Sequence, residues 1–88
     1  MIKVYTSHSC FYCTRAKNYL DNLGIDYQTL NIQEDIDARD FFVKSGFRTV
    51  PQIFVDDQLL CNGGSDGLVQ MTKEDIQNKV IELTRVRS

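Results

Sequence analysis

The feature that most constrains the fold of this chain is the order in which strand and helix patterns alternate along its 88 residues. Ile2, Val4 and the residues between them are typical of a short strand, which the polar residues 6–9 end. A helical period of apolar residues then ends at Gly24, a frequent helix stop, and residues 25–32 again resemble a strand. This β-α-β order predicts two parallel strands joined by a right-handed crossover.

The second half of the chain predicts a different unit. Residues 35–45 carry Ile36, Phe41 and Phe42 at helical spacing, and Gly46 follows as a stop. Residues 53–55 are typical of a third strand, and residues 59–60 begin a fourth strand after the turn at 56–57. Two strands this close in the chain predict a hairpin.

The end of the chain predicts a loop and a last helix. Residues 61–67, C-N-G-G-S-D-G, have the composition of a loop. Thr72 and Asp75 form a helix-start signal, and Ile76, Val80 and Leu83 give the helix one apolar face. We therefore predict one α/β domain over residues 1–88, with a four-stranded mixed sheet and helices on both of its faces.

Composition limits the classes of partner. The net charge of −2 gives no general attraction to nucleic acid or membrane surfaces. No apolar run approaches the ~18 residues that a membrane span needs. The first residues enter a strand pattern at once, without the apolar segment of a signal peptide. We therefore expect a cytoplasmic protein, in which three cysteines suggest catalysis or metal binding more than a disulfide framework.

Two of these cysteines lie in the segment S-C-F-Y-C-T, where the first strand gives way to the first helix. The first turn of a helix has backbone N–H groups without partners, and these stabilise a negative charge. The pKa of Cys10 should therefore fall below the usual value of about 8.5, which makes Cys10 the attacking thiolate. Cys13 lies one helical turn further on the same side and is predicted to be the resolving thiol.

Other interpretations of the cysteines remain open at this point. Both could be small buried core residues. Together with Cys61 and His8 they could bind zinc, although Cys61 stands alone and His8 is very close to Cys10 in the chain. His8 could also polarise Cys10 or relay a proton, or it could simply be solvated.

Two further segments also have alternative interpretations. Pro51, the only proline, opens a predicted strand, where the loss of its N–H costs little. A cis bond before it has a prior of only about 5–6%. Residues 63–67 could be a simple turn. Alternatively, a helix starting at Ser65 or Asp66 could aim their backbone N–H groups at a carboxylate and form an anion site.

The three segments together, C-F-Y-C, T-V-P and G-G-S-D, occur in an order and at positions that resemble the glutaredoxin family over nearly the whole chain. The resemblance implies the thioredoxin-like fold, glutathione as the reducing co-substrate, and a cis bond between Val50 and Pro51. It implies that the backbone of Val50 pairs with the cysteinyl unit of glutathione, and that Ser65 and Asp66 hold the γ-glutamyl end. The glutathione site expected from it comprises eight residues, namely Tyr12, Thr49, Val50, Pro51, Gly64, Ser65, Asp66 and Arg48.

Three departures from the family pattern stand out. Phe11 lies where the family usually has proline, and Ser7 lies where many members have lysine. We expect Arg48 or Arg39 to replace that lysine beside the glycyl carboxylate of glutathione. The stretch before Gly-Gly is longer than usual, and we expect its Cys61 to be a packing residue at the end of a strand.

The resemblance implies a glutathione-dependent thiol–disulfide oxidoreductase, a monomer that needs no metal. Its substrates would be protein disulfides and glutathione mixed disulfides, and ribonucleotide reductase is a family expectation as partner. Two alternatives are a glutaredoxin-like redoxin that a flavoprotein reductase reduces, and a carrier of a [2Fe–2S] cluster held by Cys10 of two chains and two glutathiones.

Overall fold

Strand β1 (Ile2–Thr6) lies inside a four-stranded mixed sheet, in a computed structural model that describes residues 2–85. It pairs in parallel with β2 (Tyr27–Asn31) and antiparallel with β3 (Gln52–Val55), which forms a hairpin with β4 (Gln58–Leu59). The strand order is β2-β1-β3-β4. The predicted β-α-β unit and the predicted hairpin are therefore confirmed, and their four strands form one sheet of an α/β fold.

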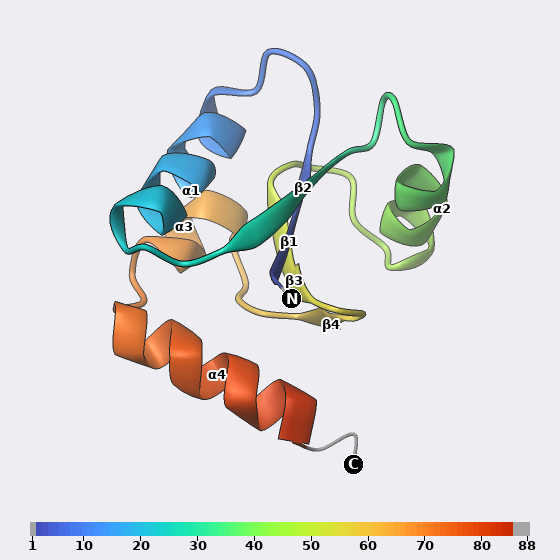
Figure 1. Ribbon diagram of the computed structural model, residues 1–88. Helices are drawn as coiled ribbons and strands as arrows, with labels where there is room; N and C mark the ends of the chain where they lie inside the picture. Colours follow the sequence, from blue (N-terminus) through green and yellow to red (C-terminus); the bar gives the residue numbers. More distant parts are fainter. Residues whose placement is uncertain (1, 86–88) are drawn as a thin grey trace.

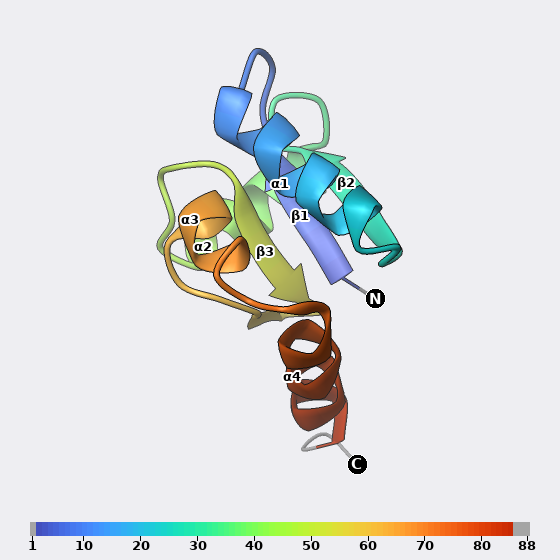
Figure 2. The ribbon, with the colours of Figure 1, turned by 90° about the vertical axis from the view of Figure 1, so that its left-hand side faces the viewer.

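The helices cover both faces of this sheet, as predicted. Figure 1 shows α1 and α3 on one side of the strands and α2 on the other, and Figure 2 shows α4 continuing beyond the end of β3. The bounds of the helices are α1 Phe11–Asn22, α2 Ile36–Lys44, α3 Gly64–Leu68 and α4 Lys73–Arg85.

Two apolar cores result because successive side chains of a strand point to opposite faces of the sheet. Ile2 and Val4 of β1 point toward α1, whereas Tyr5 points toward α2. The larger core joins the sheet to α1, α3 and α4; its buried members are Ile2, Val4, Ala16, Leu20, Ile53, Val55, Leu60, Leu68 and Ile76. The smaller core joins the sheet to α2 and is mostly aromatic; its buried members are Tyr5, Ala38, Phe42 and Phe54.

Local signals explain where the longer helices begin and end. Asp35 caps α2 by accepting hydrogen bonds from the backbone N–H groups of residues 37 and 38. Thr72 and Asp75 exchange two hydrogen bonds of 3.1 Å at the start of α4, which confirms the predicted capping box. Gly24 and Gly46 follow α1 and α2 with φ of +70° and +88°, a backbone region that favours glycine.

Three local predictions differ from the structure. The second strand is shorter than residues 25–32, and the predicted loop 61–67 contains the start of α3. Ile36 is 74% exposed, because the face of α2 that meets the sheet carries Ala38 and Phe42, one turn apart.

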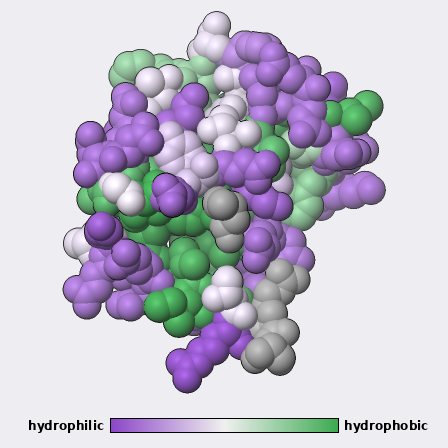
Figure 3. Space-filling view, viewed as in Figure 1, coloured by the Kyte–Doolittle hydropathy of each residue, from purple (hydrophilic) through white to green (hydrophobic). Residues whose placement is uncertain are grey.

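The surface is mostly polar on the face that Figure 3 shows, with apolar residues gathered in its lower part, toward α4. Among residues 2–85, no helix is both long and apolar enough to cross a membrane.

Candidate active site

Cys10 begins helix α1 and is its N-cap. Its backbone is extended, with φ −99° and ψ 107°, and its Sγ accepts a hydrogen bond of 3.1 Å from the backbone N–H of Cys13. The first turn of α1 contains no acidic side chain, so nothing there offsets the positive end of the helix dipole. The predicted position of Cys10 at a helix start is confirmed, and this position stabilises a thiolate on its sulfur.

Cys10 and Cys13 form a disulfide, with their Cα atoms 5.2 Å apart. Cys13 is buried, with 2% of its surface exposed, whereas Cys10 is only half-buried. An incoming sulfur therefore reaches Cys10 before it reaches Cys13. This difference in burial supports the predicted roles of Cys10 as the attacking thiol and Cys13 as the resolving thiol.

The segment before β3 lies directly beside Cys10. The Val50–Pro51 peptide bond is cis, as the resemblance implied, and the carbonyl oxygen of Val50 is 3.9 Å from Sγ of Cys10. Next to it is an open pocket of about 230 Å³. Its lining includes seven of the eight residues expected to bind glutathione, all except Arg48; the seven are Tyr12, Thr49, Val50, Pro51, Gly64, Ser65 and Asp66.

Gly64 fixes the contact between two walls of this pocket. Its φ is +58°, and a Cβ atom built on it would lie 2.6 Å from the carbonyl oxygen of Pro51. The backbone of α3 can therefore approach the Val50–Pro51 segment this closely only because residue 64 has no side chain. The two family segments T-V-P and G-G-S-D, distant in sequence, form one site for this reason.

The two arginines expected to meet the glycyl carboxylate line a different hollow from this pocket. Arg48 and Arg39 line a hollow of about 360 Å³ between α2 and the loop that follows it, together with Phe42 and Phe47. They do not line the pocket beside Cys10. The two positive charges therefore lie in one hollow, and the seven residues of the pocket beside Cys10 lie in another.

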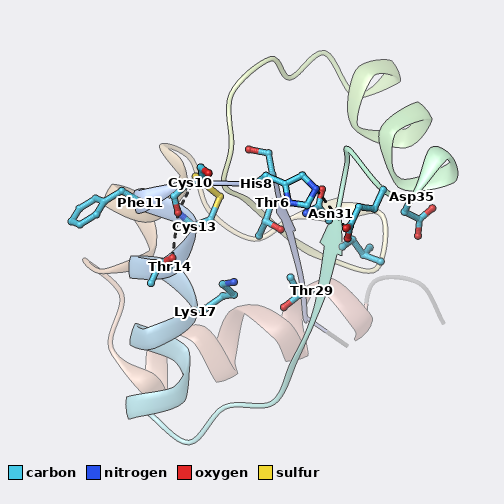
Figure 4. Close-up of a pocket in the computed structure, with 14 residues that line it drawn as sticks. Thr6, His8, Cys10, Phe11, Cys13, Thr14, Lys17, Thr29, Asn31 and Asp35 are labelled. Atoms are coloured by element: carbon cyan, nitrogen blue, oxygen red, sulfur yellow. Dashed lines mark hydrogen bonds and ion pairs between the residues drawn. A yellow bond between two sulfur atoms is a disulfide. The ribbon is translucent and has the colours of Figure 1, made fainter.

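A larger hollow of about 810 Å³ lies on the side of the disulfide that faces β2 (Figure 4). Cys10, Cys13, Lys17 and the end of β2 line it, and the ring of Phe11 points away from the two sulfur atoms. His8 also lines this hollow, and its Nε2 is 3.5 Å from a carboxylate oxygen of Glu34. The structure thus pairs His8 with the loop before α2, and does not show it bonded to either sulfur.

The third cysteine is separate from the disulfide. Sγ of Cys61 is partly buried and lies 3.8 Å from the carbonyl oxygen of Gly64, and burial raises the pKa of this thiol to about 11. Within residues 2–85, no three histidine, cysteine or acidic side chains gather as metal ligands would. The structure therefore does not bring Cys61 and His8 together with Cys10 and Cys13, as a zinc site would require.

Sequence reasoning missed one polar contact at the site. Nη1 of Arg15, in α1, donates a hydrogen bond of 2.8 Å to Oδ1 of Asp66, in α3. The two residues are 51 positions apart, so no local pattern could have indicated that they meet.

Solved structures with the same architecture define the class of protein. The chain aligns with a buckwheat glutaredoxin–glutathione complex over 92% of its own length and 76% of the other chain, at a TM-score of 0.70 and 27% identity. It aligns with the NrdH-redoxin of Escherichia coli over 60% of its length and 70% of the other chain, at a TM-score of 0.58 and 28% identity. With its C-x-x-C pair at the helix start, this fold is that of a thioredoxin-like thiol–disulfide oxidoreductase.

Sequence comparisons narrow this class to one family. The family model described as Glutaredoxin matches residues 2–60. Glutaredoxin 3 of E. coli strain K12 is 43% identical over 68 residues, which cover 76% of this chain and 80% of the relative. Glutaredoxin 1 of Rickettsia conorii is 37% identical over 84 residues, or 92% of this chain and 80% of the relative. The chain belongs to the glutaredoxin family, and its Cys10–Cys13 pair is a thiol–disulfide oxidoreductase centre.

Proposed function

We propose that glutathione is the reductant of this oxidoreductase, and that it binds in the pocket between the Val50–Pro51 segment and the start of α3. The observation that carries this proposal is the pocket beside Cys10, because seven of the eight residues expected to bind glutathione line it. Three of them, Gly64, Ser65 and Asp66, lie outside residues 2–60, the part of the chain that the family model matches.

The chemistry of this pocket suits the parts of glutathione. The backbone of Val50, beside the sulfur of Cys10, offers hydrogen bonds to the cysteinyl unit in the manner of an added strand. The carboxylate of Asp66 suits the γ-glutamyl ammonium group, and backbone N–H groups at the start of α3 suit its carboxylate. Arg48 and Arg39 line a neighbouring hollow, and their side chains are long. We propose that one of them extends from there to the glycyl carboxylate.

Two reaction sequences follow from the burial of the two sulfurs. The Cys10 thiolate attacks a substrate disulfide, forms a mixed disulfide, and releases one substrate thiolate. With a protein disulfide, Cys13 then attacks Sγ of Cys10, releases the second substrate thiol, and closes the Cys10–Cys13 disulfide. Two glutathione molecules reopen this bond and leave as oxidised glutathione. With a glutathionylated thiol, Cys10 takes the glutathione and a second glutathione removes it, so Cys13 is not needed.

A second candidate is a redoxin that a flavoprotein reductase reduces. The chain is similar in structure to the NrdH-redoxin, a glutaredoxin-like protein with a thioredoxin-like activity profile. This similarity is the reason to test the second candidate. The assembled G-G-S-D pocket favours glutathione, since a protein reductase does not need a γ-glutamyl site. We further expect the substrates to include protein disulfides, among them that of ribonucleotide reductase. We expect the protein to be a monomer.

The decisive experiment is glutathione-dependent reduction of a small mixed disulfide, coupled to glutathione reductase. We expect turnover by the native chain, loss of turnover in Cys10→Ser, and retained turnover in Cys13→Ser. Cys61→Ser is the control for the loss of a thiol that takes no part in the disulfide, and it should retain turnover.

Absence of turnover in a native chain whose disulfide dithiothreitol still reduces would refute the glutathione site. Reduction by a flavoprotein reductase would then support the second candidate. A coloured dimer after anaerobic reconstitution with iron, sulfide and glutathione would instead support the [2Fe–2S] carrier.

A further inference from the structure

The carboxylate that the proposed function assigns to the ammonium group of glutathione already has a partner on the protein. Arg15 donates to Oδ1 of Asp66 at 2.8 Å, across the gap between α1 and α3. Arg15 belongs to the helix that Cys10 begins, so this ion pair connects the helix of the nucleophile to the γ-glutamyl end of the pocket.

The two partners face different hollows of the surface. Asp66 lines the pocket beside Cys10 together with Tyr12, whereas Arg15 lines a separate hollow together with Tyr19 and Val69. The guanidinium group therefore reaches the carboxylate from outside the glutathione pocket. Within residues 2–85, Oδ2 of Asp66 has no hydrogen-bond partner, so one carboxylate oxygen is held and the other is open to a ligand.

Exposure explains why such a contact matters for binding. The side chain of Asp66 is 72% exposed and that of Arg15 is 43% exposed. An aspartate this exposed samples several rotamers, and a ligand that needs one of them must bear the cost of ordering it. An ionised carboxylate has about four lone-pair sites on its two oxygens, so it can bond the guanidinium and an ammonium at once.

We infer that Arg15 is a positioning residue for the γ-glutamyl end of glutathione: it holds the Asp66 carboxylate in the orientation that receives the ammonium group. Arg15 does not touch the ligand and acts only through Asp66. This inference rests on the proposed function. The competing interpretation is an ordinary surface ion pair that joins two helices and leaves ligand binding unchanged.

The test measures the rate constant at which two thiols reduce the Cys10–Cys13 disulfide, by acid trapping and mass spectrometry. The thiols are glutathione and N-acetylcysteinylglycine, which has the same net charge and the same glycyl end but lacks the γ-glutamyl amino acid. Because the charges match, a general electrostatic effect of a lost arginine would change both rate constants alike. The variants are Arg15→Gln, Arg15→Lys, Asp66→Asn and the double variant Arg15→Gln/Asp66→Asn.

We expect Arg15→Gln to lower the rate constant for glutathione by up to about fivefold, the range of an exposed ion pair, and to leave that for N-acetylcysteinylglycine unchanged. Arg15→Lys, which keeps a positive charge, should restore part of the loss. In the Asp66→Asn background, Arg15→Gln should have no further effect, because the arginine acts through that carboxylate.

Equal effects of Arg15→Gln on both thiols, or full additivity in the double variant, would overturn the inference. A native chain that reacts equally well with both thiols would instead refute the γ-glutamyl site itself, and with it the proposed function. These two failures are therefore separate results of one experiment.

Discussion

Replacing Gly64 by alanine tests whether the close approach of α3 to Pro51 forms the pocket. Two costs follow from the structure. A residue with a side chain at φ +58° costs about 1–2 kcal/mol relative to glycine. The new Cβ would also lie 2.6 Å from the carbonyl oxygen of Pro51, far inside ordinary van der Waals contact, and such overpacking costs about 1–3 kcal/mol more. We expect Gly64→Ala to lower the free energy of unfolding by about 2–5 kcal/mol.

Gly46 offers a matched control for this variant. It has a similar φ of +88°, but an added Cβ would meet no atom within 4 Å. Gly46→Ala should therefore show only the conformational cost, about 1–2 kcal/mol. Urea unfolding of both reduced proteins, followed by circular dichroism, gives the two values, and Gly64→Ala should also raise the KM for glutathione. Equal destabilisation by the two variants would refute the argument that Gly64 is needed for the contact with Pro51.

Two further predictions concern other parts of the chain. Burial raises the pKa of Cys61 to about 11, so its thiol should stay protonated at pH 8 and react with iodoacetamide far more slowly than Cys10 in the reduced native protein. The difference should disappear in urea, where peptide mass spectrometry should find both alkylated; rapid native alkylation of Cys61 would contradict its burial. Thr72→Ala removes one half of the capping box of α4 and should cost about 1 kcal/mol of stability in urea unfolding, whereas no change would show that this cap is unimportant.

The order of elements was predictable because local signals agreed with the final structure. Gly24 and Gly46 end their helices with the positive φ that glycine permits, and Thr72 with Asp75 begins the last one. A helix at α3 was only the second interpretation of its sequence, G-S-D-G-L, because two of its five residues are glycines, which disfavour helix. Tertiary packing overrides this preference: Ser65 and Leu68 are buried.

The candidate site was only partly predictable from the residues themselves. The helix-start position of Cys10 followed from local reasoning, whereas the seven pocket residues came from the resemblance to a family. Contacts between distant segments left no local signal. The ion pair of Arg15 and Asp66 is one of these, and the contact of Gly64 with Pro51 is another.

The N-cap role of Cys10 has a consequence for the equilibrium between oxidised and reduced protein. The sulfur that caps α1 is the sulfur that changes its bonds in every turnover, so the helix start has a different cap in each redox state. A thiolate is a stronger hydrogen-bond acceptor than a disulfide sulfur and carries the charge that a helix N-terminus favours. Any extra stability of the reduced folded state raises the reduction potential of the disulfide by the same free energy. For this two-electron couple, a cap preference of about 1 kcal/mol corresponds to about 20 mV.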